Sequence, residues 1–554
     1  MQKSNPKILF TSPCGPYPKL PIDKDPVDYF YYRNTYRQRM FQLRSFQSWH
    51  SLHFLAQNIA IDSVVLENPS FTGFQKEVNE GKYEIIAIGF TIPLTAKVLE
   101  MVDWIKANHP SIEIILGGYG TAIFKESYEI STHLKSLVDR ICFGDGNHFM
   151  NSVIREKWGI ENHRPIKQDL IPLSNSFFRT RIELFKQIVL VSGLGCVYGC
   201  SFCATSSQFN KKYIPFFNGQ QLFENLYQQF IKLRDIQSAI IYDEDFLHNR
   251  KRVLEFTEHF QNSELQNSSF LLTIFASVQS INRYSIEELV ACGIGTIFIG
   301  VETLSDEVLS SEGLVKRKGE ITEIFDQLHA HGINTLGSLV IGWDSQTEEL
   351  AKADASQFIE LNPTFYQVIP LHVIPGTKLW EDMKRENRIS DKYSFDLDGI
   401  SEMNFDTKTF SHSEALKLVF STYSGLVEQG GPWPFRLFEN LIKGYLTLKD
   451  NNNPLLQNRA RIYKSMIFPV CILSFSSRFL FHGKGFRQKW NSTMKLFAYN
   501  FPVKFIFSVV ISPLVTIILS GIYMYGNLKF SLSKSGDQPE FIRKEYKNLT
   551  NNLF

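Results

Sequence analysis

The sequence lacks an excess of charge, a disulfide framework and an apolar run at its start. Its 554 residues carry 58 Lys and Arg against 56 Asp and Glu, so the net charge is +2. This balance gives no reason to expect a nucleic-acid partner. Seven cysteines are too few for a disulfide scaffold of this length, and MQKSNPKILF has no signal-peptide core. We therefore expect a reducing, cytoplasmic location.

The N-terminal region alternates short apolar segments with helix-like ones. KILFTS, VVLE, EIIAIGF, IEIILGG and RICFG are candidate strands, and residues 93–110 place apolar side chains at helical spacing. Continuous apolar strands between helices predict a doubly wound, Rossmann-like domain over residues 1–165. Ligands of such sheets bind beyond the carboxyl ends of the strands, here 89–93, 117–121 and 143–146. Each of these glycine-bearing ends could equally be an ordinary turn.

A second alternation runs over residues 186–405. Six candidate strands, QIVLVSG, SAIIY, LLTIFAS, GTIFIG, TLGSLVIG and FYQVIPL, are each followed by a helix-like segment. Six such units predict an incomplete (β/α)6 barrel of the TIM type. Polar or glycine-rich residues follow five of the strands, and active sites of such barrels lie at that end.

The loop after the first of these strands, GLGCVYGCSFCATS, contains Cys196, Cys200 and Cys203. A structural zinc site normally closes with four ligands, and the nearest further candidate, His248, lies in another β/α unit. Three thiolates can instead hold three irons of a [4Fe–4S] cluster and leave the fourth iron open. Zinc binding and inert thiols remain the alternatives.

This CxxxCxΦC spacing, with Phe202 before the last cysteine, resembles the signature of the radical S-adenosylmethionine (SAM) superfamily. The resemblance implies that SAM ligates the open iron and is cleaved to a 5′-deoxyadenosyl radical, which abstracts hydrogen from carbon. It also implies a flavodoxin- or ferredoxin-type electron donor. Similar segments follow along the barrel and imply SAM contacts beside that of Phe202, namely Asp243, Glu244, Ser277, Gly300, Glu302 and Ile374.

A doubly wound domain ahead of such a barrel resembles the cobalamin-binding subclass. The resemblance implies cobalamin contacts at Thr91, Gly117, Gly118 and Gly144. The sequence lacks the Asp-x-His-x-x-Gly segment that would offer a lower cobalt ligand, so we expect an unliganded or water-liganded cobalt. His50 and His53 lie on a predicted helix, where packing is the expected role. Methylthiotransferases are disfavoured because only two cysteines, Cys14 and Cys142, precede the barrel.

Residues 406–554 are aromatic-rich and predicted to be helical. Their uncharged segment, 505–528, is long enough to cross a bilayer, although Pro513 and four hydroxyl residues interrupt it. It could lie at a membrane interface, contact an apolar substrate, or pack as a buried helix against 466–481. Membrane association of an otherwise cytoplasmic protein therefore stays open.

Together these features predict a radical SAM enzyme that methylates an unactivated carbon of an apolar metabolite or lipid. Cyclisation or oxidation without methyl transfer uses the same cofactors and is not separated by sequence. A metal-binding, membrane-attached scaffold or sensor is the alternative from a different class. The sequence singles out no catalytic residue.

Overall fold

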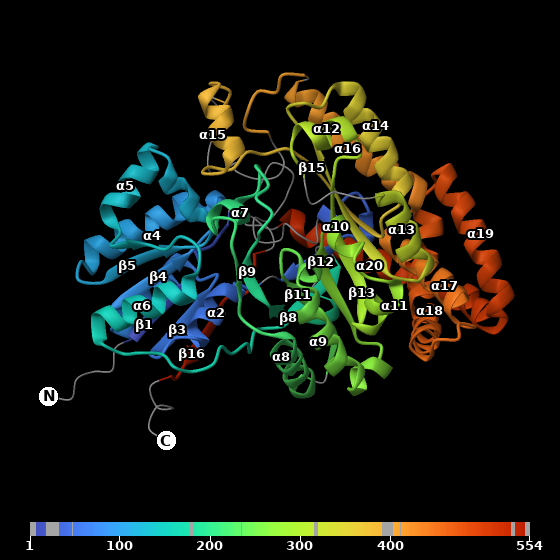
Figure 1. The fold of residues 1–554 in the computed structure, drawn as a ribbon, viewed down its shortest axis with the longest axis horizontal. Coiled ribbons are helices and arrows are strands. Elements are labelled where there is room, and N and C mark those ends of the chain that lie inside the picture. The colour runs from blue at the N-terminus through green and yellow to red at the C-terminus, as the bar shows by residue number, and fades with distance from the viewer. Residues whose placement is uncertain are drawn as a thin grey trace.

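The computed structural model describes residues 7–17, 33–46, 48–177, 182–233, 235–314, 320–390, 403–409, 411–532 and 538–548. It contains two large sheets, one N-terminal and one central, with a helical layer beyond the second (Figure 1). The six-stranded sheet has the order β16-β3-β1-β4-β5-β6, and the eight-stranded sheet has the order β15-β14-β13-β12-β11-β8-β7-β2.

The N-terminal sheet confirms the predicted doubly wound domain. Its parallel strands are β1 (Lys7–Thr11), β3 (Asp62–Glu67), β4 (Ile85–Gly89), β5 (Glu113–Gly117) and β6 (Arg140–Ile141). Helices cover both faces, and each face has its own apolar core, which explains why the strands are apolar throughout. These helices are α2 (His50–Gln57), α3 (Phe71–Gly81), α4 (Thr95–Asn108), α5 (Glu129–Leu137) and α6 (Gly146–Trp158).

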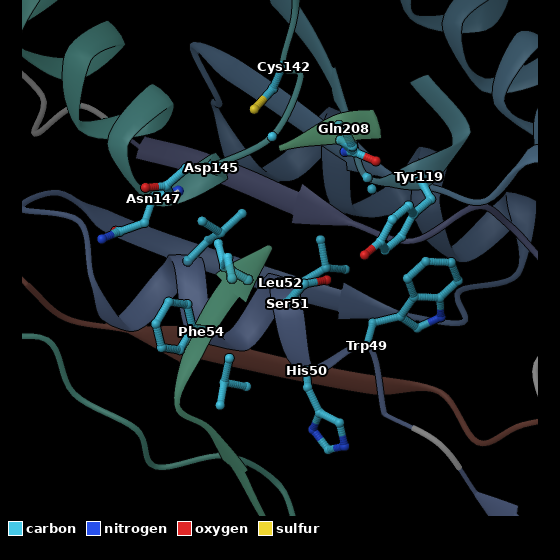
Figure 2. Close-up of a pocket in the computed structure, with 18 of the residues that line it drawn as sticks. Trp49, His50, Ser51, Leu52, Phe54, Tyr119, Cys142, Asp145, Asn147 and Gln208 are labelled. Atoms are coloured by element: carbon cyan, nitrogen blue, oxygen red, sulfur yellow. Dashed lines mark hydrogen bonds between the residues drawn. The ribbon is translucent and has the colours of Figure 1, made fainter. Parts of the chain in front are cut away.

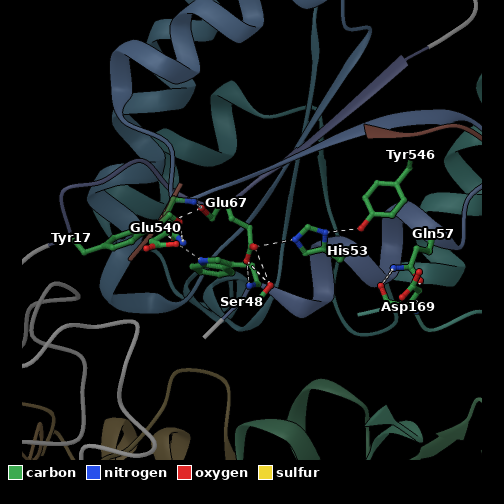
Figure 3. Close-up of polar contacts among 11 residues, drawn as sticks. Tyr17, Ser48, His53, Gln57, Glu67, Asp169, Glu540 and Tyr546 are labelled. Atoms are coloured by element: carbon green, nitrogen blue, oxygen red, sulfur yellow. Dashed lines mark hydrogen bonds and ion pairs between the residues drawn. The ribbon is translucent and has the colours of Figure 1, made fainter. Parts of the chain in front are cut away.

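One strand of this sheet comes from the far end of the chain. The C-terminal region was expected to be helical, but β16 (Ile542–Tyr546) pairs antiparallel with β3. Figure 3 shows the contacts that hold this strand. His53 Nδ1 forms a 2.7 Å hydrogen bond with the Tyr546 hydroxyl, and His53 Nε2 lies 3.0 Å from a Glu67 carboxylate oxygen. His53 and Glu67 are fully buried. His53 therefore has the packing role that the sequence favoured.

The central sheet contains the six predicted parallel strands in barrel order. They are β8 (Glu183–Val191), β11 (Ile236–Tyr242), β12 (Leu271–Ala276), β13 (Ile294–Glu302), β14 (Asn334–Ile341) and β15 (Phe365–Pro370). This confirms the partial barrel. Two antiparallel strands that the sequence analysis did not anticipate, β7 (Leu173–Phe177) and β2 (Leu43–Phe46), extend the sheet beyond β8. The barrel therefore incorporates a strand that precedes α2 in sequence.

Helices follow the barrel strands. They are α8 (Gly219–Lys232), α9 (Arg250–Gln261), α10 (Val278–Ile281), α11 (Ile286–Ala291), α12 (Asp306–Ser311), α13 (Ile321–Ala330), α14 (Glu348–Leu361) and α15 (Lys378–Arg385). A hairpin of β9 (Gly193–Gly195) and β10 (Tyr213–Pro215) with α7 (Ala204–Gln208) carries the cysteine loop.

The C-terminal helices share one continuous hydrophobic core with the barrel. They are α16 (His412–Gly430), α17 (Trp433–Leu448), α18 (Pro454–Leu480), α19 (Lys484–Asn500) and α20 (Pro502–Leu532). Helix α16 packs on β15 and α14, and α17 packs on α13 and α18. Because the core is continuous, this region is a layer of the barrel rather than a separate folding unit.

Candidate functional site

The cysteine loop lies at the carboxyl end of β8. Gly195 has a φ of +84°, and a Cβ at this position would lie 2.1 Å from the Lys212 carbonyl oxygen. Only glycine can make this turn, which carries the chain into Cys196. Cys196 is buried, whereas Cys200 and Cys203 are partly exposed. Cys203 also begins helix α7 as its N-cap residue.

Among the described residues, no three His, Cys, Asp or Glu side chains converge as ligands of a single metal ion. A [4Fe–4S] cluster does not require such convergence, because each thiolate binds a different iron. Two of the contacts that anchor the loop from outside involve Ser201 and Phe202. The Leu379 amide donates to the Ser201 carbonyl at 2.9 Å, and the Phe202 ring packs edge-on against Trp343 at 5.2 Å. Phe202 thus positions the loop, and its predicted SAM contact stays a prediction.

The two neighbouring carboxylates after β11 have different surroundings. Asp243 is buried and forms a 2.7 Å ion pair with Arg252. Tyr213 and Ser192 also donate hydrogen bonds to it. Burial alone would raise the pKa of Asp243, but the Arg252 guanidinium and these hydrogen bonds together hold it below its usual value. This environment favours a structural role for the Asp243 carboxylate.

Both carboxylates line the same two cavities, but Glu244, unlike Asp243, is exposed. One oxygen accepts a hydrogen bond from the Thr205 hydroxyl at 3.0 Å, and the same hydroxyl is 2.8 Å from the Tyr119 hydroxyl. Since Tyr119 belongs to the N-terminal domain, these hydrogen bonds link Thr205 of the cysteine loop to both domains. Of the two carboxylates, Glu244 is the one placed to meet a ligand.

Ser277 lies beside Asp245 and is buried in the protein interior. Its hydroxyl donates to Asp245 at 2.6 Å, and it caps helix α10 by accepting from the Ser280 amide. These contacts satisfy Ser277 within the protein. A contact with SAM at Ser277 stays a prediction, and the local structure already accounts for the residue.

The end of β13 has an irregular backbone. The register between β13 and β14 shifts between Gly300 and Glu302, and Glu302 has a φ of +60°, which is unusual for a residue with a side chain. A Cβ at Gly300 would lie 2.5 Å from a Glu302 carboxylate oxygen. Gly300 therefore makes room for Glu302, while Ile374 packs against the N-terminal core. Their SAM contacts likewise stay predictions.

A cavity of about 520 Å³ lies between the two domains (Figure 2). This volume falls in the usual range of ligand sites. Helix α2 forms one wall with Leu52 and Phe54, and Cys142, Asp145 and Asn147 lie across from it. The cavity is lined by all four residues predicted for cobalamin and by two predicted for SAM, namely Thr91, Gly117, Gly118, Gly144, Asp243 and Glu244.

Gly117 and Gly118 are adjacent in the cavity wall, but the protein packing requires glycine at only one of them. A Cβ at Gly118, whose φ is +89°, would lie 2.7 Å from the Phe90 carbonyl oxygen, so the fold itself requires glycine there. At Gly117 the nearest atom to a Cβ would be the Cys142 Cβ at 3.7 Å, an ordinary contact. The protein packing does not require glycine at Gly117. A ligand that approaches this strand end closely would require it.

Sequence reasoning missed several lining residues, above all His50. Neither of its buried ring nitrogens has a hydrogen-bond partner among the described residues. Burial lowers the pKa of His50 to about 4, so the imidazole is neutral. A neutral imidazole without a partner and a close-approach glycine both fit a large polar or metal-bearing ligand such as cobalamin. The helical spacing of α2 offered no signal that would separate His50 from the packed His53.

A second cavity, of about 230 Å³, adjoins the cysteine loop and is lined by Cys196, Tyr198, Glu244 and His248. The Tyr198 hydroxyl lies 3.1 Å from His248 Nδ1.

Cys14 and Cys142 are buried, and burial raises the pKa of each thiol to about 12. Both therefore remain protonated thiols. Cys14 packs in the N-terminal core, while Cys142 forms part of the larger cavity wall.

Comparison with known proteins identifies the family to which the barrel domain belongs. Residues 190–355 match the model of the radical SAM superfamily, so this part of the chain is a radical SAM domain. The resemblance drawn from the cysteine motif is thereby confirmed. The fold is similar to the radical SAM methyltransferase TsrM of Kitasatospora setae, whose structure was solved with cobalamin and a [4Fe–4S] cluster. That likeness has a TM-score of 0.52 at 11% identity and covers 83% of this chain and 99% of the other.

Two curated proteins are similar in sequence. An uncharacterized methyltransferase of Pyrococcus horikoshii is 24% identical over 55% of this chain and 64% of its own length. A bacteriochlorophyllide d C-8(2)-methyltransferase of Chlorobaculum tepidum is 21% identical over 57% of this chain and 72% of its own. The chain thus spans less than two thirds of the archaeal relative.

Proposed function

We propose that this radical SAM protein, whose fold is that of a cobalamin-binding methyltransferase, methylates an unactivated carbon of an apolar small molecule. The observation that carries the proposal is the interdomain cavity of about 520 Å³. The turns predicted to hold cobalamin and the exposed carboxylate predicted to hold SAM line the same space. Two relatives named as methyltransferases support methylation as the reaction.

Within the proposal, the chain's own residues bind and orient the reactants. Cys196, Cys200 and Cys203 hold a [4Fe–4S] cluster, and Glu244 accepts hydrogen bonds from the SAM ammonium. Thr91, Gly117, Gly118 and Gly144 form the cobalamin side of the cavity. When bound, the cluster with SAM would supply a carbon-centred radical, and cobalamin would supply the methyl group.

The aromatic lining supports an apolar substrate. Four separate segments of the chain contribute aromatic residues to the cavity lining, namely Trp49, Phe54, Phe209, Tyr242 and Phe275. Such a lining excludes water, and water exclusion protects a reactive radical from side reactions. The neutral His50 imidazole adds one polar group to this wall.

The test measures iron, sulfide and cobalt per chain in protein purified and reconstituted without oxygen in the presence of hydroxocobalamin. We expect about four irons and about one cobalt. Cys200→Ala should remain folded, lose cluster iron and lose SAM cleavage. Iron without cobalt would remove carbon methylation from the proposal. Wild-type protein that cleaves no SAM, together with a Cys200→Ala variant that loses stability, would overturn it in favour of a structural metal site.

The proposal includes two partners that the chemistry and composition indicate. Reductive SAM cleavage needs one electron at a time, which a flavodoxin- or ferredoxin-type donor supplies. Peripheral membrane contact is the second, because α20 is the one helix among the described residues that is long and apolar enough to cross a membrane.

A further inference from the structure

Helix α20 has its apolar side chains on the outside. Twelve large hydrophobic residues of this helix are between 44% and 77% exposed, and they are Val503, Ile506, Phe507, Val509, Val510, Leu514, Ile517, Ile518, Met524, Tyr525, Leu528 and Leu532. A soluble monomer rarely exposes so long a contiguous apolar surface. Phe479 of α18 and Leu496 and Tyr499 of α19 are also exposed large side chains.

The hydroxyl residues of α20 face inward instead. Ser508 and Ser512 are fully buried, and the Thr516 hydroxyl lies 2.8 Å from that of Ser476 on α18. On α18 the serines 474, 476 and 477 are also fully buried. Small and hydroxyl residues between helices, with apolar residues outside, are typical of helices that pack in lipid. Three of the four hydroxyls that interrupt the apolar run in sequence, Ser508, Ser512 and Thr516, therefore lie on its protein-facing side.

The surrounding segment is basic and contains no acid. Residues 451–532 hold ten Lys and Arg and no Asp or Glu, whereas the rest of the chain has 48 basic and 56 acidic residues. Six of the ten are exposed, and they are Arg461, Lys464, Lys484, Arg487, Lys495 and Lys529. Such charge matches the anionic headgroups of a membrane surface. A soluble apolar partner would not require it.

Both ends of α20 return to the same protein body. Its N-terminal end follows α19, which packs on α16 and α17, and its C-terminal end leads to β16 in the N-terminal sheet. Thirty-one residues span about 46 Å, and α20 packs against α18 for part of this length. A helix that crossed a bilayer would place these two ends on opposite sides of it.

We propose that the exposed face of α20 lies in the plane of an anionic membrane leaflet, with its apolar side chains among the acyl chains and the basic residues at the phosphates. The inference rests on the membrane-contact part of the proposed function and not on its chemistry. Phe479, Leu496 and Tyr499 are exposed on α18 and α19, which both pack against α20.

Vesicle flotation of the full-length protein tests the proposal. We expect it to float with vesicles of phosphatidylcholine and phosphatidylglycerol, and to float less with phosphatidylcholine alone or in high salt. Val510→Glu combined with Ile517→Glu should weaken binding at least about tenfold. Ile231→Glu, at an exposed isoleucine of α8, is the matched control and should float like the wild type.

Four outcomes would overturn the proposal. The first is that wild-type protein does not float, and the second is that the Ile231→Glu control loses as much vesicle binding as the double variant. The third is resistance to extraction at alkaline pH, which indicates a spanning helix. The fourth is a lipid-free dimer that only the double substitution dissociates. The last outcome would assign the face to a second copy of this chain. Because flotation needs no cofactor, its failure is distinct from failure of the iron and cobalt measurement.

Discussion

Asp243 and Glu244 are adjacent in sequence and predicted for the same ligand, and the structure separates them. Asp243→Ala removes one partner of a buried ion pair and leaves the Arg252 guanidinium without its counter-ion. Breaking a buried pair in this way costs about 3–5 kcal/mol. For a domain the size of the barrel this corresponds to a fall in melting temperature of about 6–20 °C.

Glu244→Gln should behave in the opposite way. The side chain is exposed, and glutamine can still accept the Thr205 hydrogen bond, so we expect stability within about 0.5 kcal/mol of wild type. Losing a charge-assisted hydrogen bond to an ammonium costs about 1.5–3 kcal/mol, so SAM affinity should fall about 10- to 100-fold. The assays are thermal unfolding and equilibrium dialysis with SAM. A stable Asp243→Ala variant that no longer binds SAM would refute the reasoning.

The ion pair also has a defined pH dependence. The pKa of Asp243 is lowered in the folded state, because Arg252 and the hydrogen bonds outweigh burial. Its contribution to stability is therefore complete above the unfolded-state pKa of about 3.9 and is lost as the pH falls through the lower folded value. The difference in stability between wild type and Asp243→Ala should be constant from pH 5 to 8 and shrink below about pH 4.

Two further predictions concern the cavity and the C-terminal strand. Gly117→Val should fold normally but lower the cobalt bound after reconstitution, because the valine side chain would occupy the cavity. Gly118→Ala should instead destabilise the protein by about 1–3 kcal/mol, since the φ of Gly118 is +89° and the Phe90 carbonyl oxygen blocks a Cβ. Tyr546→Phe should cost about 1 kcal/mol by removing the hydrogen bond to His53, and hydrogen exchange should show faster opening of β16 without loss of cluster iron.

Local patterns were sufficient for much of the fold. Each parallel strand of the two large sheets is a short apolar run between helix-like segments, and this information is contained within about ten residues. The cysteine loop is equally local, because the three predicted ligands of one cluster fall within eight positions. The strand ends could then be placed on one edge, since parallel strands share a direction.

Other features depend on neighbours that are distant in sequence. Whether Asp243 or Glu244 faces a ligand depends on Arg252 and Tyr213, which reach only one of them. His50 and His53 lie one helical turn apart, yet one meets Glu67 and Tyr546 while the other lines the cavity. Periodicity assigns a helix face but not what that face contacts.

The sequence by itself determined the parallel strands of the two large sheets, the cysteine loop and the family they indicate, because periodicity and short spacings encode them locally. Only the tertiary structure decided that Ile542–Tyr546 completes a sheet begun by residues 7–11 and that the uncharged helix carries its apolar face outward. Strand pairing across about 475 residues leaves no local periodicity, and an apolar run has the same composition whether protein or lipid covers it.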